Sequence, residues 1–188
     1  MMVSKSPRRP RKADTPASAR DLPPPGLLQS PEQVIQYYKR MGLEVDSSIP
    51  IEAIIGANPE LELRYADLGI NDAYIKKIAE NRFEIGVNSK HHPNRQRFSM
   101  AHEYGHYLLH RGKIHEMPEG EQILHRNGDR NRVEYQANDF AAELLMPEML
   151  VRKSFRSSGG SLKKMSDTLC VSKEALKYRL ENLGYKVT

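Results

Sequence analysis

The chain has 188 residues, of which 38% are apolar, and its formal net charge is +5. This composition suits one globular domain with appendages and allows a compact enzyme. The single cysteine, Cys170, excludes an internal disulfide framework, and no apolar run has the length of a membrane span or a secretory signal. We therefore expect a cytoplasmic protein with no membrane partner.

The positive charge is concentrated at the start of the chain. The first 20 residues hold six of the 29 basic residues and only Asp14 of the 24 acidic ones, so the rest of the chain is electrically balanced. Residues 1–29 are rich in proline and serine and lack an apolar period with which to bury surface. We expect them to form a disordered basic tail that is dispensable for folding. The tail could bind nucleic acid, but we do not favour that partner.

Two short helices are predicted after this tail. Ser30 can cap a helix over residues 31–41, and Pro31 fits its first turn. Residues 51–56 predict a second helix, which a proline precedes and Gly56 can end.

The hydrophobic period then changes from that of a helix to that of strands. Residues 61–68 alternate between apolar and polar, which is typical of a strand. Residues 73–88 predict two strands joined by a turn near Glu80 and Asn81. We expect a small antiparallel sheet. We also expect residues 82–88 to expose an edge beside the functional site, where an extended peptide could bind.

The stretch "RFSMAHEYGHYLLH", residues 97–110, carries the clearest chemical signal. On a helix, His102 and His106 lie four residues apart on one side, so both imidazoles can reach one ion. Glu103 points about 100° further round and is free to hold a water molecule. This is the H-E-x-x-H pattern of zinc peptidases. The alternative is an amphipathic helix whose histidines are merely solvated.

A zinc ion held by two histidines needs a third protein ligand. The segment "VEYQANDFAAELLMP", residues 133–147, predicts a second amphipathic helix in which Glu134 is the best candidate. Ala137 and Ala141 share its side and permit a close approach of another helix. Gly105, in the middle of the first helix, is explained by such a tight crossing, because glycine otherwise costs about 1 kcal/mol in a helix interior.

Other residues of these two helices have more than one reading. Glu134 could be a carboxylate favoured by the helix dipole. Glu143 is the alternative ligand, or a partner for Arg97 or another basic residue. His110 could hold a metal ligand in place or cap its helix. Three tyrosines could donate to an oxyanion, and the sequence does not choose among them: Tyr104, Tyr107 and Tyr135.

The two histidine- and glutamate-bearing segments resemble the ImmA/IrrE family of metallopeptidases. The resemblance extends back through "EIGVNSKHHPNRQRF" and covers roughly residues 30–155. It implies a zincin-like α+β fold, a bound zinc ion, and limited proteolysis of a helix-turn-helix repressor of the Xre type. By motif match, His102, His106 and Glu134 are the implied zinc ligands and Glu103 is the implied general base.

The end of the chain predicts two helices joined by a tight turn, over residues 161–184. This resembles a helix-turn-helix. Basic residues on its second helix are offset by acidic ones, so we favour docking on the protease or its substrate, with Tyr178 and Leu180 in recognition. The expected organisation is a tail (1–29), a zincin-like metallopeptidase domain (30–156) and a helix-turn-helix-like segment (157–188).

We therefore expect a zinc-dependent endopeptidase that makes limited, regulatory cuts in a protein substrate. Two other classes stay open. One is a DNA-binding regulator that uses the tail and the terminal helices, and the other is a toxin–antitoxin partner whose metal site is vestigial.

Overall fold

A computed structural model describes residues 24–116, 118 and 130–186 of the chain, so the expectations for residues 1–23 lie outside it. None of the helices in these ranges is long and apolar enough to cross a membrane. The described elements, in chain order, are η2 (Pro25–Leu27), α1 (Pro31–Arg40), α2 (Ile51–Gly56), β1 (Leu61–Ala66), β2 (Ala73–Ala79), β3 (Arg82–Asn88), α3 (Pro93–Leu109), α4 (Arg111–His115), α5 (Arg130–Leu145), α6 (Glu148–Ser158), α7 (Leu162–Leu169) and α8 (Lys173–Asn182).

The three strands form a mixed sheet in the order β1-β3-β2. The tight turn at Asn81, whose φ is 56°, joins β2 and β3 as an antiparallel pair, as predicted. β1 pairs with the other side of β3 and runs parallel to it. The expectation of a purely antiparallel sheet is therefore wrong. The expectation that β3 is an exposed edge is also wrong, because both of its sides are paired.

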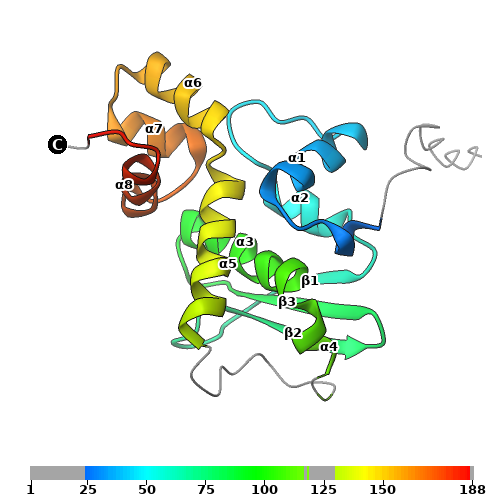
Figure 1. Ribbon diagram of the computed structural model, residues 1–188. Coiled ribbons are helices and arrows are strands. Elements are labelled where there is room, and N and C mark those ends of the chain that lie inside the picture. The colour runs from blue at the N-terminus through cyan, green and yellow to red at the C-terminus, as the bar shows by residue number, and fades with distance from the viewer. Residues whose placement is uncertain (1–23, 117, 119–129, 187–188) are drawn as a thin grey trace, which may run out of the picture.

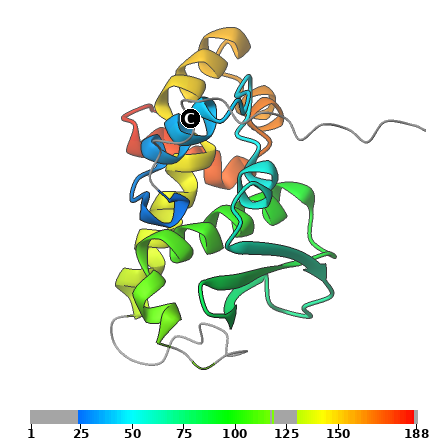
Figure 2. The same ribbon diagram turned by 90° about the vertical axis from the view of Figure 1, so that its right-hand side faces the viewer.

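Helices cover one face of this sheet. α3 lies across that face, and α1, α2 and the C-terminal helices lie beyond α3 on the same side (Figure 1, Figure 2). Phe83 of β3 is fully buried there, with its ring centroid 5.5 Å from that of Tyr107 on α3. On the opposite face, a Cβ at Gly86 would lie 2.3 Å from the ring of Tyr74, so only glycine fits beneath that ring.

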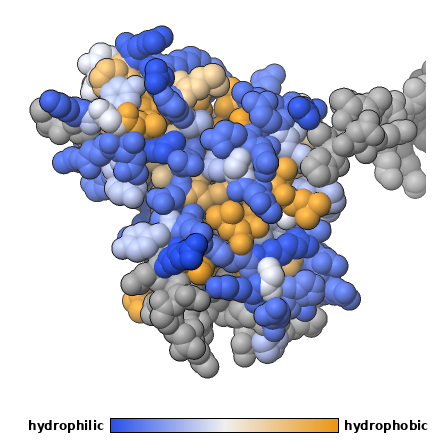
Figure 3. Space-filling view, viewed as in Figure 1, coloured by the Kyte–Doolittle hydropathy of each residue, from blue (hydrophilic) through white to orange (hydrophobic). Residues whose placement is uncertain are grey.

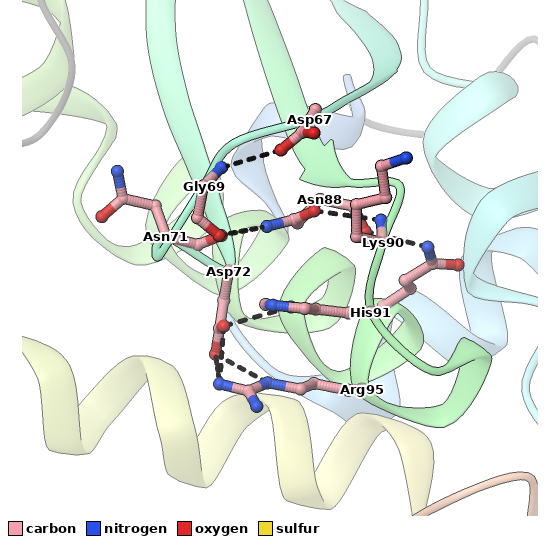
Figure 4. Close-up of polar contacts among 9 residues, drawn as sticks. Asp67, Gly69, Asn71, Asp72, Asn88, Lys90, His91 and Arg95 are labelled. Carbon is pink, nitrogen blue, oxygen red and sulfur yellow. Dashed lines mark hydrogen bonds and ion pairs between the residues drawn. The ribbon is translucent and has the colours of Figure 1, made fainter.

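Polar contacts fix the start of α3 against the loop between β1 and β2 (Figure 4). Buried Asn88 donates from Nδ2 to the carbonyl oxygens of Gly69 at 3.1 Å and Asn71 at 2.8 Å. Arg95, in the first turn of α3, pairs with both carboxylate oxygens of Asp72, at 2.7 and 3.0 Å from Nη2. The direction in which α3 leaves the sheet is therefore set by side chains as well as by the short loop.

The C-terminal helices are docked on α3 and α5. Arg179 of α8 is buried; its Nη1 donates to Glu143 at 3.0 Å and its Nε donates to the carbonyl of Met146 at 3.1 Å. Arg97 of α3 donates to the carbonyl of Cys170, in the turn between α7 and α8, at 3.1 Å. The two terminal helices thus share the core with the rest of the described chain.

This docking corrects part of the expectation for α8. Leu180 is only 3% exposed and packs in the core, so its expected role in recognition is wrong. Arg179 is also turned inward, which leaves Lys173 and Lys177 as exposed basic residues beside the exposed acidic Glu174. Tyr178 is 51% exposed and stays available at the surface.

The described residues before Ser30 pack on the body, although we expected them to belong to the tail. Leu28 is 5% exposed, and Gly26 lies close to the side chains of Tyr107 and Arg111. Hydrophilic side chains cover most of the face seen in Figure 3, but apolar ones gather near its middle. The 3-10 turn at Pro25–Leu27 delivers Leu28 to the core.

Replacing Leu28 by alanine should lower the free energy of unfolding by about 2 to 3 kcal/mol, because a buried leucine loses its contacts and leaves a cavity. Leu27 is the matched control, since it is 66% exposed and its replacement should change stability by less than about 0.5 kcal/mol. Chemical denaturation of the two variants measures the difference. Equal stability of both would show that residues before Ser30 do not contribute to the core.

Candidate metal centre

The first part of the site is carried by α3. Its N-terminus is capped by His92, whose Nδ1 accepts from the backbone N–H of Asn94 at 3.2 Å, and Pro93 occupies the first helical position. The helix then continues to Leu109 and contains the H-E-x-x-H stretch without interruption. Helical spacing therefore places His102 and His106 side by side, with ring centroids 4.6 Å apart.

The second part of the site is carried by α5, which crosses α3 closely at Gly105. A Cβ at Gly105 would lie 3.2 Å from Cδ1 of Phe140 and 3.4 Å from the carbonyl oxygen of Ala137. Ala137 and Ala141 are fully buried at the crossing. The tight crossing expected from these small residues is confirmed, and it brings Glu134 over the two histidines.

Three donor atoms converge at this crossing. The Nε2 atoms of His102 and His106 are 3.0 Å apart, and the carboxylate of Glu134 lies 3.3 Å from the first and 3.4 Å from the second. Tetrahedral coordination with bonds near 2.0–2.1 Å separates neighbouring ligand atoms by about 3.3–3.4 Å. The three side chains therefore fit one tetrahedral metal ion.

Hydrogen bonds on the far side of each imidazole orient it toward the centre. Nδ1 of His102 lies 3.0 Å from Oδ1 of Asn138 on α5. Nδ1 of His106 lies 3.0 Å from Nδ1 of His110, whose Nε2 lies 3.2 Å from Oε1 of Gln136. Because amide oxygens only accept, the protons lie on Nδ1 of His102 and on Nε2 of His110. Nδ1 of a neutral His110 then accepts from Nδ1–H of His106. The Nε2 atoms of His102 and His106 therefore keep lone pairs for a metal.

The electrostatics of His106 and Glu134 agree with this arrangement, whereas the pKa of His102, which burial alone would lower, is raised by Glu134 and Glu103. Burial lowers the pKa of His106 to about 4, although its hydrogen bond with Glu134 acts in the opposite direction. Burial alone would raise the pKa of Glu134, but hydrogen bonds and charge from the two histidines hold it well below its usual range. At neutral pH the site thus offers a neutral imidazole and an ionised carboxylate, which are the forms that bind metals.

Glu103 lies beside the three donors without joining them. It is 8% exposed, and burial raises the pKa of its carboxyl to about 7, although the nearby His102 lowers it. A carboxyl with a pKa near neutrality can both take up and release a proton. A cation in the site would favour the ionised form that accepts one.

The structure separates the three tyrosines that the sequence left open. Tyr104 and Tyr107 are fully buried, and Tyr107 donates its hydroxyl hydrogen to Glu60 at 2.6 Å. Tyr135 follows Glu134 directly and is 66% exposed. Of these three, only Tyr135 presents its side chain at the surface.

Glu143 is not part of the centre. Its carboxylate pairs with Arg179 of α8 at 3.0 Å, so its partner is a basic residue, though not Arg97. Arg97 instead donates to the backbone carbonyls of Cys170 and Ile49. Glu143 therefore ties α8 to α5 and takes no part in the metal centre.

Two residues of the site were missed from the sequence, namely Asn138 and Gln136. Asn138 lies four residues after Glu134, so helical spacing could have placed it on the same side of α5. Gln136 carried no such signal, because its role depends on where α5 crosses His110. Both residues act by orienting the imidazoles of other residues.

Two comparisons with known proteins agree with this geometry. A family model described as the IrrE N-terminal-like domain, peptidase M78, matches residues 59–181, from the loop before β1 into α8. The radiation response metalloprotease IrrE of Deinococcus radiodurans is 29% identical over 136 residues, which cover 68% of this chain. The matched part is 39% of that relative, so this chain spans well under half of its length. The chain therefore belongs to the ImmA/IrrE family of metallopeptidases.

Proposed function

We propose that this protein is a zinc-dependent endopeptidase with a zincin-like core, which makes limited, regulatory cuts in a protein substrate. The observation that carries the proposal is that His102, His106 and Glu134 each offer a ligand atom within 4.8 Å of the others, with Glu103 beside them. Two imidazole nitrogens and one carboxylate are a usual ligand set of catalytic zinc.

Each residue of the site has a separate role in the proposed hydrolysis. His102, His106 and Glu134 would hold a zinc ion, which would act as a Lewis acid that makes water more acidic and polarises a carbonyl. Glu103 accepts the proton of the attacking water and returns it to the nitrogen of the leaving amine. Tyr135, exposed and next in the chain to Glu134, is the proposed donor of a hydrogen bond to the oxyanion that develops on the cut carbonyl.

The proposed substrate is a helix-turn-helix repressor, and the helix-turn-helix-like pair α7–α8 contributes to its recognition. The family resemblance supports the substrate class. The relative named as a metalloprotease supports the reaction. DNA binding by α8 has less support, because Arg179 is buried in an ion pair and is lost to a phosphate-binding face. Incubating the zinc-loaded protein with purified helix-turn-helix repressors of its own organism, followed by mass spectrometry, tests the substrate.

Replacing Glu103 by glutamine should leave zinc binding intact and reduce peptide cleavage by at least about 100-fold, since an amide cannot accept the proton of water. Glu116→Gln is a matched control, because Glu116 is an exposed residue outside the centre. Zinc content and cleavage rate are measured on the same samples. Full turnover in Glu103→Gln would rule out this residue as the general base.

Replacing Glu134 by alanine should weaken binding of Zn²⁺ or Co²⁺ strongly, by loss of a ligand. Glu143→Ala should keep the metal affinity and lower the melting temperature instead, because buried Arg179 loses its partner. Calorimetric metal titration and thermal unfolding separate the two effects. The reverse pattern would show that Glu143 is the ligand.

His110→Ala should lower metal affinity by about 10- to 100-fold, because His106 loses the group that orients it. His115→Ala on α4 is the control and should leave affinity unchanged, since His115 lies outside the donor cluster. The readout is a competitive zinc titration against a chelator. An unchanged affinity in His110→Ala would assign this histidine a structural role only.

A further inference from the structure

A cavity of about 300 Å³ opens directly beside the metal centre, between α3, α5 and α8. Its apolar wall is formed by Phe98, Ala142 and Ala175, one from each helix. Asn138 also lines it, and this is the residue whose Oδ1 lies 3.0 Å from Nδ1 of His102. The cavity therefore neighbours the metal centre on the Nδ1 side of His102, and the side chain of Asn138 lies between the cavity and this ligand.

The rim of the cavity carries two exposed aromatic side chains. Tyr135 of α5 is 66% exposed and Tyr178 of α8 is 51% exposed, and both line the opening. Tyrosines at the edge of an apolar pocket commonly anchor a bound polypeptide, because each offers a flat apolar ring and a hydroxyl. Tyr135 directly follows the ligand Glu134 in α5, so this rim begins beside a residue of the metal centre.

We infer that this cavity is the subsite that selects the substrate, by accepting one apolar side chain, of about the size of leucine, next to the cut bond. The inference rests on the proposed peptide hydrolysis for the identity of its occupant. A volume of about 300 Å³ lies at the lower end of small-molecule sites and suits one side chain. Its apolar wall favours an aliphatic or aromatic group over a polar one.

One charged group competes with this reading. Asp139 lies at the same cavity and offers a carboxylate to a basic side chain. It is an exposed residue, however, and an ion pair at an exposed position contributes little. Because the wall at Ala142 is buried, we favour an apolar occupant over a basic one. The test below includes a basic ligand for comparison.

The first experiment does not depend on catalysis. The full chain, loaded with zinc and labelled with ¹³C in its alanine methyl groups, is titrated with N-acetyl-leucinamide, N-acetyl-alaninamide and N-acetyl-lysinamide. The leucine compound should shift the Ala142 and Ala175 signals and leave that of exposed Ala53, on α2, in place. No shift with the leucine compound, or a stronger response to the lysine compound, would overturn the inference.

The second experiment uses cleavage of a randomised peptide library, with the cuts mapped by mass spectrometry. Wild type should prefer an apolar residue at one position beside the cut bond. Ala175→Phe fills the cavity and should reduce kcat/KM for leucine relative to alanine at that position by about tenfold or more. Ala53→Phe is the matched control and should keep the wild-type preference.

The two proposals fail in different ways. The subsite proposal is wrong if wild type cleaves peptides without an apolar preference, or if Ala175→Phe keeps that preference. In both cases the proposed peptide hydrolysis is still supported. If zinc-loaded wild type cleaves nothing, the proposed hydrolysis fails, and the methyl signals alone decide whether the cavity takes an apolar group. If Ala175→Phe loses zinc or unfolds, Tyr178→Ala at the exposed rim replaces it, with the same expected loss of preference.

Discussion

The close crossing of α3 and α5 is the contact on which the metal centre depends. Two donor residues come from α3 and the third from α5, so the centre exists only while the helices touch. At Gly105 the nearest atoms of α5 leave only 3.2–3.4 Å for a Cβ. Helix axes in proteins are usually 8–10 Å apart, depending on the residues between them. A larger residue at Gly105 would push α5 outward and carry the carboxylate of Glu134 away from the imidazoles.

The same crossing provides the groups that orient the ligands. α5 contributes Asn138 toward His102 and Gln136 toward His110, so one helix supplies both a ligand and the supports of the others. Because Asn138 also lines the cavity beside the centre, a substrate side chain there would lie next to the group that holds His102. Binding at the cavity and the tautomer of His102 are thus linked through one amide.

Local features of the sequence were enough to predict much of the site. The histidines and Glu103 lie within one helix, where spacing alone decides which side chains are neighbours. Glu134 could be chosen because Ala137 and Ala141 marked the side of α5 that approaches another helix. The position of β1 could not be predicted, because strand order depends on contacts between distant segments. Leu28 was missed because a 3-10 turn has no apolar period, and its burial depends on the surface that receives it.

The docking of the terminal helices has a consequence for selectivity. Arg179 is a buried charge whose partners are Glu143 and the carbonyl of Met146, both at the end of α5. Moving α8 away from α5 would break both of these contacts of Arg179. Ala175 and Tyr178 lie on the same helix within four residues of Arg179, so they are held at a fixed distance from Phe98 and Ala142. On the proposed subsite, walls held in this way would discriminate by size, because the cavity could not widen without separating Arg179 from Glu143 and from the carbonyl of Met146.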